Sequence, residues 1–66
     1  MNILINGVSY TLPESAYLSD ALQLLALAGK RVACELNGEI VPRSRYAETV
    51  LAEGDSIELV VAVGGG

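Results

Sequence analysis

The chain has 66 residues, with eight acidic side chains, four basic ones and a formal net charge of −4. This length allows one domain with one small core, and an apolar content of 52% is enough to fill it. The negative charge disfavours nucleic acid as a partner, because a phosphate backbone would be repelled. Histidine is absent, so the commonest general base is missing. We therefore expect a folded protein that is not itself an enzyme.

The apolar runs and the single cysteine exclude further classes. The longest apolar run, residues 24–28, is far too short to span a bilayer, and the N-terminus lacks the basic-then-apolar order of a signal peptide. We expect a cytoplasmic protein without a membrane partner. Cys34 cannot form an internal disulfide or a paired-cysteine zinc site. Its alternation with Val32 and Leu36 predicts a buried side chain on a strand.

The N-terminal residues predict a β-hairpin. Asn6-Gly7 tolerates the positive φ angles of a type I′ turn, and it separates two apolar, β-branched segments at 3–5 and 8–12. Pro13 ends the second strand.

Residues 18 to 28 have helical spacing, and Gly29 is the expected stop. Ser15 and Ser19 are both candidate caps, and neither is followed by the Glu or Gln of a capping box. The expected core face consists of Leu18, Ala21, Leu22, Leu25 and Ala28, with Asp20 and Gln23 on the opposite face.

A second strand pair is predicted at 32–36 and 39–41, joined by Asn37-Gly38 and closed by Pro42. Residues 42–52 lack a clean period, so we expect a loop with a short 3₁₀ turn at 44–47. After the turn at 53–55, alternation from Ser56 to about Val63 predicts a last strand with Ile57, Leu59, Val61 and Val63 on one face. The order ββαββ predicts an α+β fold, the ubiquitin-like β-grasp, with one helix packed on one face of a mixed sheet.

The last three residues, Gly64, Gly65 and Gly66, carry no side chain. We expect a domain at 1–63 and a flexible tail at 64–66, because ordering glycine costs the most entropy. Such a tail fits a narrow channel and delivers the Gly66 carboxylate to its end. ATP can activate a carboxylate as an acyl adenylate, which a sulfur nucleophile converts to a thiocarboxylate.

Five segments together resemble the sulfur carriers of thiamin (thiazole) biosynthesis, the ThiS family. They are Ile3-Leu4-Ile5-Asn6-Gly7, Leu36-Asn37, Ile40-Val41-Pro42-Arg43, Glu53-Gly54-Asp55 and Ala62-Val63-Gly64-Gly65-Gly66. Their order and spacing carry the resemblance, which covers essentially the whole chain. The chain departs at Tyr17, where many members of that family have a small capping residue, and this affects only the expected helix start.

The resemblance implies a set of partners and a role for the tail. Gly66 would carry the sulfur as a thiocarboxylate, and Gly64 and Gly65 would thread into partner active sites. An adenylating enzyme of the ubiquitin-activating type would use ATP and magnesium, so this chain would bind no cofactor of its own. A cysteine desulfurase would supply sulfur indirectly, and thiazole synthase would accept it. Because the tail would pass from one enzyme to the next, we expect a monomer that forms transient complexes.

Six further residues are candidates for partner docking. Leu27 is expected opposite the core face of the helix with Leu24 on its flank, and together with Val60 and Ala62 they would form an apolar patch. Exposed leucines are also ordinary on protein surfaces. Arg43 and Glu58 would add charged contacts, although solvated surface charge is the simpler explanation of both.

Two other functions remain open from the sequence. The first is the small subunit of molybdopterin synthase, which shares the fold and the Gly-Gly end but is usually longer and richer in aromatic core residues. The second is a ubiquitin-like interaction module without chemistry at its tail. Deleting Gly66 would leave the binding of such a module intact.

Overall fold

The computed structural model describes residues 1–61, which form five strands and two short helices. In chain order the elements are β1 (Asn2–Ile5), β2 (Val8–Thr11), α1 (Leu18–Leu24), β3 (Val32–Leu36), β4 (Glu39–Val41), the 3₁₀ helix η1 (Arg43–Glu48) and β5 (Ser56–Val61). The predicted order ββαββ is confirmed, and both predicted strand pairs are present. The predicted 3₁₀ turn is confirmed as η1, one residue longer at each end.

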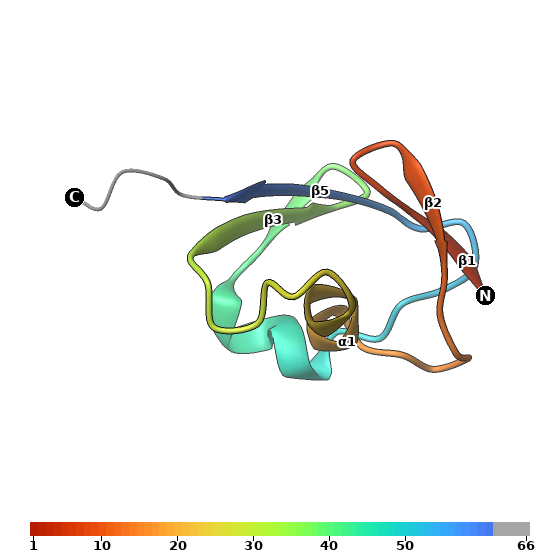
Figure 1. Cartoon of the computed structure of the whole chain (residues 1–66), viewed down its shortest axis with the longest axis horizontal. Coiled ribbons are helices and arrows are strands. Elements are labelled where there is room, and N and C mark those ends of the chain that lie inside the picture. Colours follow the sequence, from red (N-terminus) through yellow and green to blue (C-terminus); the bar gives the residue numbers. More distant parts are fainter. Residues whose placement is uncertain (62–66) are drawn as a thin grey trace.

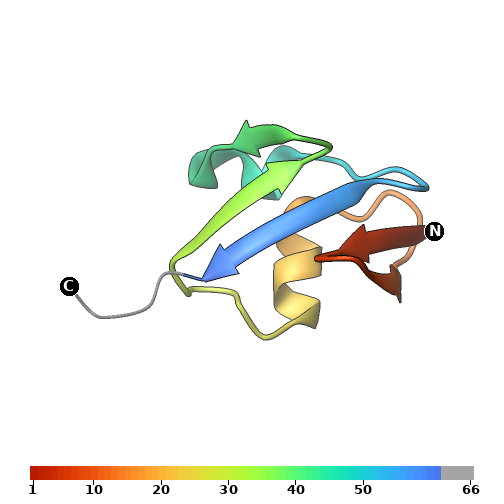
Figure 2. The ribbon, with the colours of Figure 1, turned by 90° about the horizontal axis from the view of Figure 1, so that it is seen from above.

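The five strands form one mixed sheet in the order β2-β1-β5-β3-β4. β5 lies in the centre, parallel to β1 and antiparallel to β3. Figure 1 shows α1 and η1 below the sheet, and Figure 2 shows β5 crossing above α1. A mixed sheet with β1 and the last strand side by side and a helix across one face is the β-grasp arrangement, so the predicted fold is confirmed.

The turn of each hairpin is an Asn-Gly pair whose backbone lies in the left-handed region of φ and ψ. Asn6 and Gly7 have φ angles of 51° and 81°, and Asn37 and Gly38 have φ angles of 51° and 85°. Positive φ at both central residues defines the type I′ turn, whose twist matches that of the flanking strands. The hairpin prediction from these dipeptides is confirmed at both places.

The helix is shorter than predicted. It begins at Leu18, where the Asp20 carboxylate accepts a hydrogen bond of 2.7 Å from the backbone N–H of Tyr17, so neither candidate serine is the N-cap. It ends at Leu24, and the prediction of a helix to Ala28 is wrong. Ala26 takes a φ of +58° in place of the expected glycine stop.

The hydrogen bonds after Leu24 explain this early end. The N–H of Ala26 donates to the carbonyl of Gln23, and the N–H of Leu27 donates to the carbonyl of Leu22. This pair of bonds is the Schellman motif, which satisfies two carbonyls at a helix C-terminus. The motif turns the chain three residues before Gly29.

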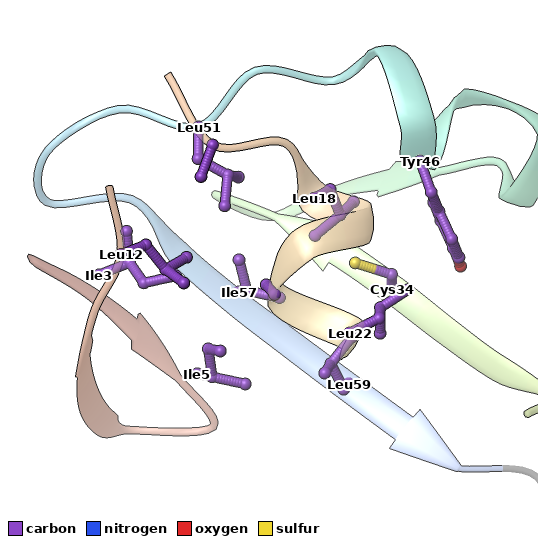
Figure 3. Packing of buried hydrophobic residues seen from close by; sticks show 12 residues of the cluster. Ile3, Ile5, Leu12, Leu18, Leu22, Cys34, Tyr46, Leu51, Ile57 and Leu59 are labelled. Carbon is purple, nitrogen blue, oxygen red and sulfur yellow. The ribbon is translucent and has the colours of Figure 1, made fainter. Parts of the chain in front are cut away.

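The core lies between the helical layer and one face of the sheet (Figure 3). Alternation along β1 and β5 points every second side chain toward α1, whose Leu18 and Ala21 are fully buried. Burying one such aliphatic side chain stabilises a fold by about 1.5–3 kcal/mol. The buried cluster consists of Ile3, Ile5, Leu12, Ala16, Leu18, Ala21, Leu22, Cys34, Tyr46, Leu51, Ile57 and Leu59.

Candidate functional site

The strand that leads to the predicted tail is paired on both sides within the sheet. β5 is the last described element, and Ala62, Gly64, Gly65 and Gly66 lie outside the described residues. Five residue pairs join β5 to β3, from Val32 opposite Val61 to Leu36 opposite Ile57. On its other side β5 pairs with β1 through Ser56 and Ile57. The chain therefore enters its last five residues from a fixed strand.

Two asparagine side chains hold β5 in addition to the strand ladders. The Asn6 side-chain amide donates to the Leu59 carbonyl at 3.1 Å, and its oxygen accepts from the Leu59 N–H at 2.8 Å. The Asn37 oxygen likewise accepts from the Ser56 N–H at 2.9 Å. The left-handed turn conformation of each asparagine orients its side chain toward β5. The same dipeptides that close the hairpins therefore also position the strand before the tail.

The face of β3, β4 and β5 that points away from α1 carries an apolar and acidic surface. In antiparallel ladders directly opposite residues share a face. Val60 lies opposite Ala33, Glu58 lies opposite Glu35, and Glu35 also lies opposite Ile40. We call these five residues the outer patch: Ala33, Glu35, Ile40, Glu58 and Val60. Ile40 is 80% exposed and Val60 is 67% exposed, so both are open to a partner.

The structure separates the candidate docking residues that the sequence grouped together. Leu24 is 51% exposed on α1, whereas Leu27 is half-buried and packs against the core. The expectation that Leu27 lies opposite the core face is wrong, because the Schellman turn swings it back onto the core. Val60 lies on the opposite side of the sheet from α1, so Leu24 and Val60 do not form one patch.

The two charged candidates do lie together with Val60. Arg43, Glu58 and Val60 line a hollow of about 260 Å³, which all five residues of the outer patch also line. Arg43 follows Pro42 at the start of η1 and is exposed. Arg45, two residues later, forms an ion pair with Glu48 on the same helix. The docking role of Arg43, Glu58 and Val60 stays a prediction.

Three members of the outer patch, Ala33, Glu35 and Ile40, were not predicted from the sequence. Alternation along 32–36 places Cys34 in the core and therefore Glu35 on the outer side, so that signal was present. The sequence does not predict that Ile40 lies on this face, because its neighbours depend on the register of the β3–β4 pair.

Cys34 is buried, as predicted from its alternation. Its side chain is 2% exposed and faces α1 from β3. Burial, with the neighbouring Glu35 carboxylate as a second cause, raises the pKa of the Cys34 thiol from 9.0 to about 11. The thiolate is the reactive form of cysteine, so this thiol is a weak nucleophile near neutral pH. Within residues 1–61 no three potential metal ligands cluster, and no helix there is long and apolar enough to cross a membrane.

Comparison with known protein families identifies the chain. The model of the ThiS family matches residues 3–66, nearly the whole sequence. The chain belongs to the ThiS family. A solved structure agrees with this assignment: a thiamine biosynthesis protein (ThiS) from Geobacter metallireducens shares 35% identity over the full length of both chains, with a TM-score of 0.82.

Curated relatives of this ThiS family member include a sulfur carrier and longer proteins named as thiazole synthases. The sulfur carrier protein ThiS of Bacillus subtilis is 40% identical over 53 residues, which cover 80% of each chain. A thiazole synthase of Paramagnetospirillum magneticum is 38% identical over all 66 residues. The chain spans only about a fifth of that protein's length, and the same holds for a thiazole synthase of Magnetococcus marinus.

Proposed function

We propose that this protein is a sulfur carrier of thiamin biosynthesis whose sulfur is held on the Gly66 carboxylate. The observation that carries the proposal is the ThiS family match, which extends to Gly66. The Bacillus subtilis relative, named as a sulfur carrier, supports it over four fifths of each chain. The buried Cys34 thiol, with its raised pKa, is a poor alternative site for carrying sulfur.

The chemistry belongs to partner enzymes. An adenylating enzyme, using ATP and magnesium, converts the Gly66 carboxylate to an acyl adenylate and releases pyrophosphate. A cysteine desulfurase supplies the sulfur indirectly as a persulfide, which a thiol reduces by two electrons to a sulfide equivalent. The sulfide then attacks the carbonyl carbon and displaces AMP, which leaves a thiocarboxylate. The carrier contributes the carboxylate, the Gly64-Gly65 segment that threads into the active site, and a folded domain that the enzymes grip.

Thiazole synthase is the proposed acceptor of the sulfur. Two proteins named as thiazole synthases contain a region that matches this chain from end to end. Joining the carrier and the acceptor in one chain raises their effective concentration, which favours the transfer of sulfur between them even when their contact is short-lived. A carrier and an acceptor on two different chains would form the same contact transiently.

Intact-mass spectrometry tests the proposal. The protein is incubated with the adenylating enzyme, ATP, magnesium and sulfide, beside a matched variant that lacks Gly66. We expect a mass gain equal to the exchange of one oxygen for one sulfur in the full-length chain only. No gain in the full-length chain, with the enzyme shown to be active on another carrier, would contradict the proposal. An equal gain in both proteins would place the sulfur elsewhere than on Gly66.

A further inference from the structure

The sequence contains a single lysine, Lys30, and the fold places it close to the end of β5. Lys30 stands two residues before Val32, and Val32 pairs with Val61, the last residue that the structure describes. The Cα atoms of directly opposite residues in antiparallel strands are about 5 Å apart, and two further residues add at most about 7 Å. The Cα atom of Lys30 therefore lies within about 12 Å of the Cα atom of Val61.

The side chain of Lys30 is open to solvent. A turn precedes it, in which the backbone N–H of Lys30 donates to the Leu27 carbonyl at 3.0 Å. The side chain is exposed, and the two ion pairs found among residues 1–61 do not involve it. Within that part of the chain no carboxylate holds the ammonium group in place. The amine is therefore accessible to an electrophile.

The last residues of the chain are long enough to bring the Gly66 carbonyl carbon to this amine. Gly66 follows Val61 by five residues, and at about 3.5 Å per residue these span at most about 17 Å. The span exceeds the distance of about 12 Å from Val61 to Lys30. Three of the five residues are glycine, which tolerates the φ angles that a return toward the fold needs. Groups joined by so short a segment meet at a millimolar effective concentration.

The N-terminal ammonium is out of reach of the terminal carbonyl. Met1 lies three positions before Leu4, and Leu4 is level with Ser56 in the parallel β1–β5 pair. Val61 lies five positions after Ser56, so Met1 and Val61 are about 26 Å apart along the strands at about 3.3 Å per residue. Figure 1 accordingly shows the N-terminus at the opposite end of the sheet from the end of β5. The lysine is therefore the one amine near enough to react.

We propose that Gly66, once activated, acylates Lys30 of the same chain when no sulfide takes the acyl group. The amine nitrogen attacks the Gly66 carbonyl carbon of the acyl adenylate, and the bond from this carbon to the AMP oxygen breaks. AMP leaves with the bonding electron pair, one amine proton passes to solvent, and an isopeptide bond closes a ring. The ring has no free terminal carboxylate, so the carrier is withdrawn from sulfur transfer. The inference rests on the proposed function, which supplies the acyl adenylate.

Other nucleophiles of the chain compete poorly with Lys30. The Cys34 thiol is 2% exposed and faces α1, so it does not meet the terminal carbonyl. The chain has no histidine to activate a hydroxyl group. Sulfide and the lysine amine therefore compete for one carbonyl, and the ring forms when sulfide is scarce.

Intact-mass spectrometry with and without sulfide tests the inference. The carrier is incubated with the adenylating enzyme, ATP and magnesium, and without sulfide we expect a monomer that is lighter by one water. At about 10 µM carrier the ring should exceed conjugates between chains about a hundredfold, because the effective concentration within one chain is millimolar. An endoproteinase that cuts after lysine splits the unmodified chain at Lys30 and should leave the ring uncut. Added sulfide should replace the ring with the thiocarboxylate.

Lys30→Arg is the matched control. It keeps the positive charge and removes the nucleophilic amine, so the loss of mass should disappear while thiocarboxylate formation with sulfide is unchanged. A second control, Lys30→Arg with Thr11→Lys, moves the amine to β2. The register of β2, β1 and β5 places Thr11 about 25 Å from Val61, so this variant should form at most about a tenth as much ring.

A carrier prepared with Gly66 as a C-terminal thioester tests the reach to Lys30 without any enzyme. Attack by the amine releases the thiol and closes the same ring, whereas the thioester of Lys30→Arg should only hydrolyse. Absence of the ring from this reaction would overturn the inference. So would its absence from the enzymatic reaction when ATP–pyrophosphate exchange shows that the adenylate forms. An equal loss of mass from Lys30→Arg, or conjugates between chains in place of the ring, would also overturn it.

Failure of this inference is distinguishable from failure of the proposed function. A carrier that gains sulfur on Gly66 when sulfide is present, yet forms no ring without it, keeps its function and loses Lys30 as an acceptor. A carrier that gains no sulfur, with the enzyme active on another carrier, contradicts the function itself. The thioester reaction still tests Lys30 in that case, because it needs neither the adenylating enzyme nor ATP.

Discussion

The side chain of Asn6 pairs with the backbone of Leu59 as though it were a further residue of β1. Its amide donates to the Leu59 carbonyl at 3.1 Å and its oxygen accepts from the Leu59 N–H at 2.8 Å, across 53 positions of sequence. The backbone N–H of Asn6 also donates to the Ile57 carbonyl at 2.9 Å. The first hairpin turn therefore extends the β1–β5 ladder to within two residues of the end of β5.

Replacing Asn6 with aspartate should break half of this pairing. The carboxylate still accepts from the Leu59 N–H, but it faces the Leu59 carbonyl without a hydrogen to donate. We expect the free energy of unfolding to fall by about 1–2 kcal/mol, because a partly buried carbonyl loses its partner. Urea denaturation followed by circular dichroism measures the change.

Asn2→Asp is the matched control for Asn6→Asp. It makes the same chemical change on β1, at an exposed side chain whose oxygen only accepts from the Thr11 hydroxyl. An aspartate there keeps that acceptor and should cost less than about 0.5 kcal/mol. Equal losses from the two variants would show that the pairing with Leu59 contributes nothing beyond the added charge.

Ala26→Gly should stabilise the protein. Ala26 holds a φ of +58° at the end of α1, where an L-residue with a Cβ is strained and glycine is not. We expect the free energy of unfolding to rise by about 0.5–1 kcal/mol, since relief of strain exceeds the entropy cost of glycine. The measurement is again urea denaturation.

Ala28→Gly serves as the control for this substitution. Ala28 is exposed and has no positive φ, so glycine only adds freedom to the unfolded chain. A loss of about 0.4–1 kcal/mol is expected there. A loss at both positions would mean that the backbone at Ala26 is not strained.

The hairpins could be predicted from the sequence because their signals are local. Asn6-Gly7 and Asn37-Gly38 specify a turn type, and alternation on either side specifies the strands. The second role of each asparagine, its hold on β5, depends on a strand 19 or more residues away and has no local signal. The outer patch was missed in part for the same reason, since it exists only once β3, β4 and β5 are aligned.

The end of α1 was mispredicted because two stop signals compete. Gly29 is the stronger stop by residue type, and it does take a positive φ of 81°. The chain nevertheless leaves the helix at Ala26, which lets Leu27 pack on the core. Tertiary packing thus outweighs the local preference for glycine at the helix end.

The stability of the protein should fall between about pH 9 and pH 11 because of Cys34. Burial raises the pKa of its thiol from 9.0 to about 11, so the folded state favours the protonated form. The resulting stabilisation is fully present below the unfolded pKa and is lost as the pH rises through the folded pKa. We expect a loss of about 2 kcal/mol across this window in the unaltered protein.

Cys34→Ala isolates the contribution of the thiol. The variant is less stable at neutral pH, because it leaves a small cavity, but its unfolding free energy should decline less steeply above pH 9. The pKa of Tyr46 is raised by burial and, as a second cause, by the charge of Cys34, so the substitution also removes part of the Tyr46 shift and flattens the decline further. Parallel curves for the two proteins would contradict a raised pKa at Cys34.

Charging Leu24 and Leu27 separately should distinguish their places in the fold. Leu27 follows the left-handed Ala26 in the Schellman motif, where a hydrophobic residue contacts the preceding helical turn, and it packs against the core. Leu27→Glu brings a carboxylate to that half-buried position and should lower the free energy of unfolding by about 2 kcal/mol. Leu24→Glu alters an exposed side chain and should cost less than about 0.5 kcal/mol. Urea denaturation measures the free energy of unfolding of both variants. Equal losses would mean that Leu27 is as exposed as Leu24.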